Sequence, residues 1–308
     1  PTKSEYMSDK KYTIIAFVDG PAFNDVVCNF GNAGWIKRRI PGSVLVACFN
    51  PRVELSAEAL LLCPDIDYIM AAESGVSIDD LMDSHYSPME YMPKEIRDVI
   101  AQPDLVLMPS MLTNIYPLAE GAVLEVPAWY GIEAKERLIA MGLDPGRWFA
   151  CIHVREDGYR GGRSPRSVHD VDPYNRLIDH IIEEQGGQVI RLGDQSMTPI
   201  PPRHGLVDLS RLGAPLLQQC FSVAHARYMI GSDSGPCSWA FLFDTPLGQT
   251  NKLNPLLICP HIFVCSTKTF IMADDSRLSG RAAGRAGLMN EWLWNGKMDR
   301  LVENSVDD

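Results

Sequence analysis

The sequence predicts an α/β protein made of two open domains that face each other across a cleft. Short apolar runs rich in β-branched residues alternate with helical segments, and this alternation occurs on both sides of about residue 145. Such alternation is typical of parallel strands joined by helices. A length of 308 residues also fits two domains of ordinary size better than one. We therefore expect one domain over 1–145 and a second over 146–308.

The first half is expected to form one parallel sheet with its helices. Its first strand, over 13–18, is apolar and stops at Asp19-Gly20-Pro21. The elements expected next are a helix over 25–32, a strand over 43–49, a helix over 57–62, and strands over 68–71 and 105–108. The polar stretch 74–103 is expected to lie outside the sheet. A helix over 133–141 ends at Gly142, before a linker over 143–146.

The second half repeats the pattern. The elements expected are a strand over 148–154, a helix from an Asp172 N-cap to Gly186-Gly187, strands over 188–192 and 205–209, a helix over 215–226, and a strand over 227–231. Ligands of parallel sheets bind at the carboxyl ends of the strands. The loops that follow these strands are therefore the places to look for chemistry.

Composition excludes several classes of protein. The chain is 46% hydrophobic and 22% charged, which is too apolar for a disordered protein, and it has no apolar run long enough to span a bilayer. A net charge of −11 disfavours a general nucleic-acid binder. None of the eight cysteines forms a C-x-x-C pair. We therefore expect buried free thiols, a reducing compartment and a cytoplasmic location.

A concentrated positive site follows the strand expected over 148–154. Strand alternation places His153 and Arg155 on the same side, at the carboxyl end of this strand. The glycine-rich stretch 158–166 then adds Arg160, Arg163 and Arg166. The planar fork of arginine suits bidentate binding of phosphate, so the loop predicts an anion site. The alternative is a solvated loop whose arginines pair with nearby carboxylates, namely Glu156, Asp157 and Asp170.

A second anion site is predicted where the strand over 227–231 ends. The loop Ser232-Asp233-Ser234-Gly235 lies between this strand and a helix start. Backbone N–H groups and hydroxyls can surround a phosphate there, and the helix dipole favours negative charge. The alternative is an ordinary capped helix, because Ser and Asp are common N-caps. Together with the arginine loop, this segment predicts a diphosphate site.

Further polar residues follow the strand over 188–192. Arg191 stands in an apolar strand and needs a partner, because burying an unpaired charge is costly. We expect Asp194 or Asp233 to form a structural salt bridge with it, unless the site uses these residues to bind the diphosphate. The candidate ligands in this region are Arg191, Gly193 and Asp194, with Thr250 and Asn251 from a later segment.

A general base is expected from the loop after the first strand. A carboxylate there can accept a proton from an attacking hydroxyl, and the candidates are Asp25 and Asp19. The alternatives are a helix N-cap for Asp25 and a turn residue for Asp19. The chain has neither G-x-G-x-x-G after a strand nor G-x-x-x-x-G-K-[ST], which disfavours the common dinucleotide and P-loop sites.

Three blocks of the second half resemble, in order, a group of bacterial glycosyltransferases of the GT-B superfamily. The blocks are His153–Arg160, Arg191–Pro199 and Ile230–Gly235. The first is also similar to the His-x-Arg motif of GDP-fucose-dependent fucosyltransferases, and the third to the donor-diphosphate loop of heptosyltransferases. Asn24-Asp25-Val26-Val27 resembles the Gly-Asp-Val segment of heptosyltransferases, whose aspartate is the proposed base, although Asn24 replaces the glycine.

The resemblance implies a GT-B-like fold, with two Rossmann-like domains and a nucleotide-sugar donor in the C-terminal one. The implied activity moves a sugar from a GDP-, UDP- or ADP-linked donor to a hydroxyl of a glycan, glycolipid or protein. Arg155 would neutralise the diphosphate leaving group. No D-x-D pair stands at a strand end near these loops, so neither a metal nor a cofactor is expected. The segment 283–301 is expected to hold a final helix that packs back on the N-terminal domain.

Other interpretations stay open on the same fold. The protein is alternatively a nucleotide-sugar epimerase, a pyruvyl transferase, or an inactive protein that binds nucleotide sugars. An epimerase needs paired carboxylates at the sugar carbon, and an inactive protein lacks a base. A peripheral membrane contact through Trp129-Tyr130 and the segment 292–294 is a further possibility, against the commoner use of these residues in core packing.

Overall fold

The computed structural model divides into two compact units, Pro1–Pro127 and Ala128–Asp308. It describes residues 12–18, 22–49, 56–71, 103–112, 121–157, 166–252, 262–272, 276–279, 282 and 298–302. Helix α6 (Ala128–Ala140) belongs to the second unit because it packs on α9 (Leu216–His225), where Gln218 Nε2 donates to the Ala134 carbonyl over 3.0 Å. The helix expected over 133–141 thus lies after the division. None of the described helices is long and apolar enough to cross a bilayer.

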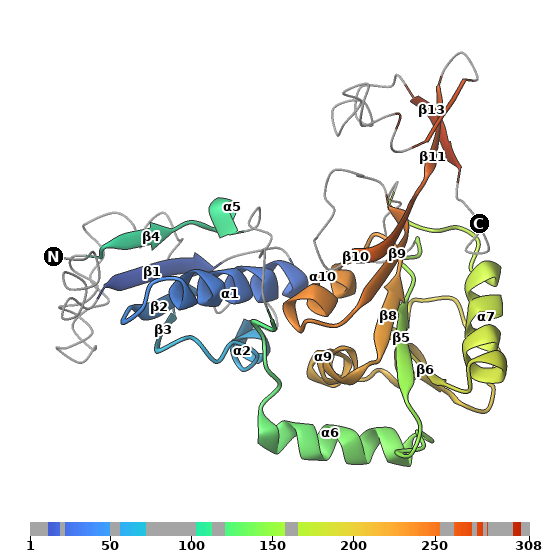
Figure 1. Ribbon diagram of the computed structural model, residues 1–308, viewed down its shortest axis with the longest axis horizontal. Coiled ribbons are helices and arrows are strands. Elements are labelled where there is room, and N and C mark those ends of the chain that lie inside the picture. Colours follow the sequence, from blue (N-terminus) through green and yellow to red (C-terminus); the bar gives the residue numbers. More distant parts are fainter. Residues whose placement is uncertain are drawn as a thin grey trace, which may run out of the picture. The chain divides into compact units, whose positions relative to one another are not determined.

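The first unit is built on a parallel sheet with the strand order β3-β2-β1-β4 (Figure 1). Its strands are β1 (Thr13–Val18), β2 (Val44–Phe49), β3 (Tyr68–Ala71) and β4 (Leu105–Leu107). The helices among its described residues are α1 (Phe23–Arg38), α2 (Ser56–Leu60) and α5 (Pro109–Leu112). Every residue of β1 is buried, as expected for an apolar strand inside a parallel sheet. These strands confirm the prediction, whereas 74–102 lies outside the described residues.

Helix α1 is longer than the sequence predicted, since it continues to Arg38. Its middle turns are buried although they contain polar and small residues. Asn32 Nδ2 donates to the Leu112 carbonyl over 2.6 Å. At Gly34 an added Cβ would lie 3.1 Å from the Cys63 Sγ atom, so the helix passes close to the segment that follows α2. Because this stretch contains polar residues and glycine, it lacks the regular spacing of apolar residues from which a helix is predicted.

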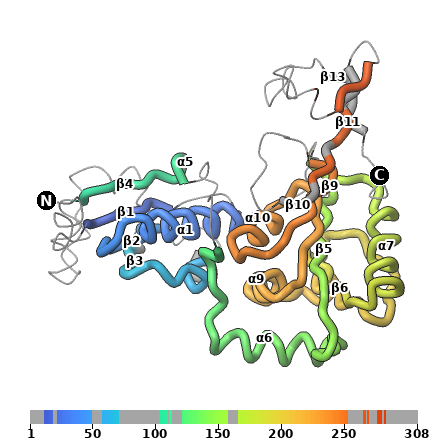
Figure 2. Tube along the Cα trace, viewed as in Figure 1, coloured from blue at the N-terminus to red at the C-terminus, as the bar shows by residue number. Residues whose placement is uncertain are grey.

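The second unit contains a six-stranded sheet with the order β10-β9-β8-β5-β6-β7. The strands are β5 (Phe149–His153), β6 (Gln188–Arg191), β7 (Leu206–Asp208), β8 (Tyr228–Gly231), β9 (Leu247–Lys252) and β10 (Ile262–Thr267), and all pairs are parallel. Strands β5 and β8 lie side by side although they are far apart in the sequence (Figure 2). The strand order reverses between them, and ligands of open α/β sheets bind at such a switch point.

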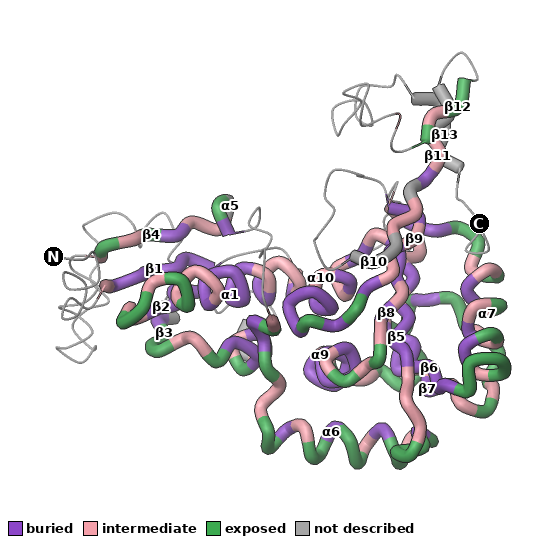
Figure 3. The backbone as a smooth tube through the Cα atoms, viewed as in Figure 1, coloured by how far each residue is buried: buried purple, intermediate pink, exposed green. Residues whose placement is uncertain are grey.

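Helices cover both faces of this sheet. On one face α7 (Asp172–Asp179) packs Tyr174 and Ile178 against Ala150 and Ile152 of β5. On the other lie α9 and α10 (Gly235–Leu242), which stand across the sheet from α7 in Figure 1. The short helix α8 (Leu209–Leu212) follows β7 directly. Figure 3 shows that the strands between these helices are largely buried.

The start of α7 corrects one prediction. Asp172 is the first helical residue rather than the N-cap, which is Val171. The Asp170 carboxylate, one residue before this N-cap, accepts a hydrogen bond from the Asp172 N–H over 2.9 Å and so satisfies the first N–H of the helix. The helix continues as a π-helix, η3 (His180–Glu184), before Gly186.

The C-terminal part forms a small antiparallel sheet with the order β12-β11-β13. Its strands are β11 (Thr269–Met272), β12 (Arg277–Leu278) and β13 (Met298–Val302). The helix predicted over 283–301 is wrong at its end, because Met298–Val302 pairs with β11 in the register Phe270↔Leu301. The preceding residues, 283–297, lie outside the described part.

Candidate functional site

The carboxyl ends of β5 and β8 form one locked edge. The two strands pair as far as His153↔Gly231, and the Ser232 N–H then donates to the His153 carbonyl over 3.1 Å. In return the Arg155 N–H donates to Ser232 Oγ over 2.7 Å. The Arg155 carbonyl accepts from the Val168 N–H over 2.7 Å. The backbone of Arg155 is therefore held from both sides at the switch point of the sheet, and both predicted anion loops meet there.

The loop from Ser232 to Gly235 packs tightly under the start of α10. Ser232 is fully buried, and its carbonyl accepts from the Cys237 Sγ–H over 3.0 Å. Ser234 is the N-cap residue, but its hydroxyl contacts Cys237 Sγ at 3.5 Å and does not cap the helix. At Gly231 an added Cβ would lie 2.5 Å from Cys237 Sγ, so only glycine fits. No side-chain hydrogen bond caps this described helix start, where Pro236 has no N–H and the Cys237 N–H donates to the Ser234 carbonyl over 3.3 Å. The positive end of the helix dipole is what this start offers to an anion.

His153 brings a neutral imidazole to the same edge. Burial, followed by the charge of Arg191, lowers its pKa from 6.5 to about 4, against a smaller opposing effect of Asp194. Its Nδ1 atom is buried and has no hydrogen-bond partner within the described ranges. Buried polar atoms are normally satisfied, so this nitrogen is a candidate contact for a bound molecule.

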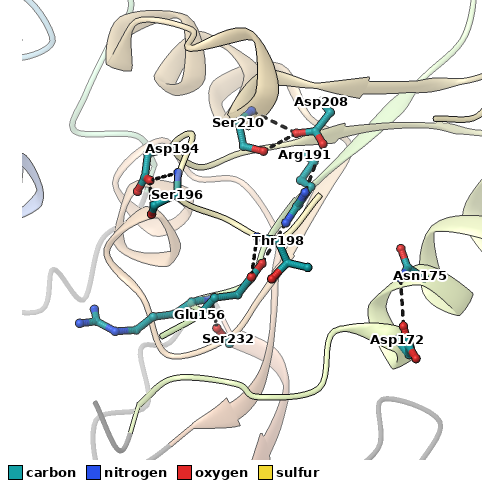
Figure 4. Close-up of polar contacts among 11 residues, drawn as sticks. Glu156, Asp172, Asn175, Arg191, Asp194, Ser196, Thr198, Asp208, Ser210 and Ser232 are labelled. Atoms are coloured by element: carbon teal, nitrogen blue, oxygen red, sulfur yellow. Dashed lines mark hydrogen bonds and ion pairs between the residues drawn. The ribbon is translucent and has the colours of Figure 1, made fainter. Parts of the chain in front are cut away.

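Arg191 is part of a buried ion-pair network (Figure 4). Its side chain is 3% exposed, with Nη1 3.1 Å from Asp208 Oδ2 and Nη2 2.9 Å from Glu156 Oε1. The second Glu156 oxygen accepts from the Thr198 N–H over 2.7 Å. The predicted partners Asp194 and Asp233 were wrong, because β6 pairs with β7 and sets Arg191 opposite Asp208. Arg191 thus connects residues at the carboxyl ends of β5, β6 and β7. Its contacts support the predicted role in a structural salt bridge.

The residues after β6 are also held by protein contacts. The Gly193 N–H donates to Gln219 Oε1 over 2.9 Å, and its carbonyl accepts from Gln219 Nε2 over 3.1 Å. Gly193 has φ +141°, and an added Cβ would lie 1.8 Å from Met197 Sδ. Asp194 is exposed and accepts from the Ser196 N–H over 2.8 Å (Figure 4). The structure thus uses the Gly193 amide to order the loop instead of leaving it for a phosphate.

Two predicted ligands from β9 turn towards helix α7. Thr250 Oγ1 lies 2.6 Å from the Tyr174 hydroxyl, and Asn251 Nδ2 donates to the same hydroxyl over 3.4 Å. Asn251 is 2% exposed and has φ +51°, a backbone conformation that is uncommon for residues other than glycine. These contacts fix the carboxyl end of β9 beside that of β8.

The arginine loop is described only at its ends. Arg166 contacts Asp233, with its Nε donating to the Asp233 carbonyl over 3.2 Å and its Nη2 3.5 Å from Oδ1. This supports the predicted alternative of arginine–carboxylate pairing for Arg166, although with another partner than those expected. Arg160 and Arg163 lie outside the described residues.

The candidate bases lie in the first unit. Asp25 is in the first turn of α1 and half-buried, and the N-cap of this helix is Ala22. The alternative role of Asp25 as N-cap is therefore wrong. Asp19 lies outside the described residues. Within the described ranges no group of three or more His, Cys, Asp or Glu side chains is arranged to hold a metal ion.

Sequence reasoning missed two residues of this edge. Glu156 was considered only as a partner of the loop arginines, whereas it holds Arg191 and Thr198. Lys252, which is 6% exposed at the end of β9, was not singled out at all. The only available signal was a lysine close to Thr250-Asn251 in the sequence.

Neither the protein-family models nor the curated proteins include a match to this chain. Among solved structures, glycosyltransferase family 9 from Veillonella parvula is 11% identical, with a TM-score of 0.50 over 79% of this chain and 81% of that one. E. coli ADP-heptose LPS heptosyltransferase II is 13% identical, with a TM-score of 0.52 over 85% and 91%. The chain has the fold of these glycosyltransferases. The GT-B-like fold class predicted from the sequence is thereby confirmed.

Proposed function

We propose that this protein is a glycosyltransferase that moves a sugar from a nucleotide-diphosphate sugar to a hydroxyl of a glycan, glycolipid or protein. The observation that carries the proposal is the locked edge of β5 and β8. There Ser232 Oγ holds the Arg155 amide at 2.7 Å beside the uncapped start of α10. An arginine and a helix N-terminus at a switch point suit the diphosphate of such a donor.

The chemistry required of this edge is stabilisation of a leaving group. As the bond between sugar and diphosphate breaks, negative charge grows on the phosphate oxygens. Arg155 supplies a positive charge there, and the start of α10 adds the positive end of its helix dipole. We propose that these charges act without a metal ion. The Nδ1 atom of His153 offers a neutral contact to a hydroxyl of the donor.

The proposed general base is Asp25, which would accept the proton of the attacking hydroxyl. The heptosyltransferase of similar fold is named for ADP-heptose, so ADP-linked sugars stand beside GDP- and UDP-linked sugars among the candidate donors. A cytoplasmic site of action and peripheral contact with a membrane-bound acceptor belong to the same proposal.

The first test is a thermal-shift screen of the full chain against UDP, GDP, ADP and CMP with their common sugar conjugates. A ligand that binds the native state raises the melting temperature. We expect one nucleoside diphosphate to give a selective shift that Arg155→Ala removes. Arg211→Ala on α8 makes the same change in net charge at an exposed position and should keep the shift. If no nucleotide stabilises the wild type, the proposed diphosphate site is wrong.

The second test follows the products of the preferred donor. Release of the nucleoside diphosphate with a sugar joined to an acceptor, and loss of that turnover in Asp25→Asn, is the expected result. Conversion of the donor into an isomer without nucleotide release would instead identify an epimerase. Binding without any turnover would identify an inactive sugar-nucleotide-binding protein.

A further inference from the structure

Lys252 is a buried lysine at the carboxyl end of β9. Its residue exposure is 6%, and its Nζ donates to Gln249 Oε1 over 2.9 Å, where Gln249 is itself buried. An ammonium group has three hydrogens to donate. Within the part of the chain that the structure describes, the ammonium group of Lys252 donates to this neutral amide oxygen and forms no ion pair with a carboxylate. Such burial of a charge without a counter-charge is costly.

In the described part of the structure, little negative charge lies around Lys252. Burial raises the pKa of the Cys237 and Cys265 thiols. Smaller effects come from Lys252, which lowers both pKa values, and from Asp233, which raises them, so both charges lie near these two thiols. Cys237 is in the first turn of α10, where the helix dipole is positive. Asp233 is already in contact with Arg166. Among the described residues, two cations, Arg166 and Lys252, and a helix N-terminus therefore lie around one carboxylate, that of Asp233.

The backbone is bent to bring Lys252 to this position. In a regular strand, residues three apart point to opposite faces. Here the pairing with β10 shifts between Gln249 and Lys252, and the intervening Asn251 has φ +51°. This bulge turns Lys252 to the side of Gln249, which makes their hydrogen bond possible. Bulges and strained residues of this kind are concentrated beside active sites, where they re-aim a side chain.

We propose that Lys252 is a further binding residue of the donor site, and that its ammonium contacts a phosphate of the nucleotide-diphosphate sugar at the start of α10. The inference rests on the proposed function. A phosphate supplies both the hydrogen-bond acceptors and the negative charge that the described residues do not provide. Arg155, just after β5, and Lys252, the last residue of β9, then approach the diphosphate from either side of the Ser232–Gly235 loop.

The test is Lys252→Met, which keeps the length of the side chain and removes its charge. The ligands are inorganic pyrophosphate and the nucleoside diphosphate that the wild type prefers, with Kd measured by titration calorimetry. We expect both affinities to fall about tenfold or more, as for the loss of a charge-assisted hydrogen bond. The melting temperature of the ligand-free protein should stay the same or rise, because a buried charge without a counter-charge has been removed.

Two lysines provide comparisons. Lys135→Met, on the exposed side of α6, makes the same change in net charge and should leave both quantities unchanged. Lys37 donates to the Asp65 carbonyl and pairs with Asp67, so Lys37→Met should lower the melting temperature without changing Kd. It shows how the loss of a structural lysine appears in the same assays.

A Lys252→Met protein that melts lower and binds as tightly as the wild type would overturn the inference. If that variant does not fold, Lys252→Gln is measured in its place, and failure of both to fold assigns Lys252 a structural role. These results differ from failure of the proposed function, in which the wild type itself binds neither pyrophosphate nor any nucleoside diphosphate.

Discussion

Replacing Arg191 by methionine should destabilise the second unit strongly. The substitution keeps much of the side-chain volume and removes the cation between Glu156 and Asp208. The side chains of these two carboxylates are only 9% and 14% exposed, so water solvates them poorly once the guanidinium is gone. Removing one partner of a buried ion pair typically costs about 3–5 kcal/mol. For a unit of this size that corresponds to a fall in melting temperature of about 6–20 °C.

The assay is urea unfolding of Arg191→Met, compared with a variant that also carries Glu156→Gln and Asp208→Asn. Neutral amides keep hydrogen bonds to the Thr198 and Ser210 N–H groups and need no cation. We expect this triple variant to recover more than half of the lost stability, because the interaction energy is shared among contacting groups. A loss below about 1 kcal/mol for Arg191→Met would refute the assignment of a buried, charge-balanced network.

Three further changes test the same edge. Glu156→Ala removes a negative charge next to Arg155, and this loss of charge alone would tighten diphosphate binding. We nevertheless expect weaker binding in calorimetry, because the loop loses the contacts of Glu156 with Arg191 and Thr198. Tighter binding would contradict this expectation. Gly193→Ala should cost about 2–4 kcal/mol in urea unfolding, since its Cβ would meet Met197 Sδ at φ +141°; unchanged stability would show that the loop adjusts freely. His153 is neutral when folded, with a pKa of about 4 against 6.5 in the unfolded chain, so the unfolded state binds more protons between these values. The free energy of unfolding should therefore fall by on the order of 3 kcal/mol as pH falls through this window. For His153→Gln the same free energy, plotted against pH, should change less. Parallel curves for the two proteins would show that His153 is not the group responsible.

The fold was predictable where a buried strand has a continuous apolar sequence. The run over 13–18 became β1 because both faces of a parallel strand are covered, so its composition alone marks it. Helix α1 was underestimated because its buried turns contain Asn29, Asn32 and Gly34, which pack through hydrogen bonds and close approach. The strand at Met298–Val302 depends on pairing with β11, a distant segment that local periodicity does not reveal.

The candidate site was predictable only as far as topology determines it. Arg155 and Ser232 come together because the carboxyl ends of neighbouring parallel strands share an edge. The partners of Arg191 depend on which strand lies beside β6 and in which register, and neither is visible in the residues themselves. Lys252 reaches its position through a bulge at Asn251, in a strand that the sequence analysis did not predict.

The strand order of the six-stranded sheet also determines when this edge is assembled during synthesis. Strands β5, β6 and β7 are made in succession and pair in that order, so half of the sheet can form on the ribosome before β8 exists. The opposite side of β5 must wait for β8, and the Arg155–Ser232 hydrogen bond closes a span of 77 residues. A nascent chain halted before β8 therefore carries an unpaired β5 edge, which is a template for pairing with other chains. The pairing of β5 with β8, which ends in the Arg155–Ser232 hydrogen bond of the proposed anion site, thus also covers a strand edge that would otherwise favour aggregation.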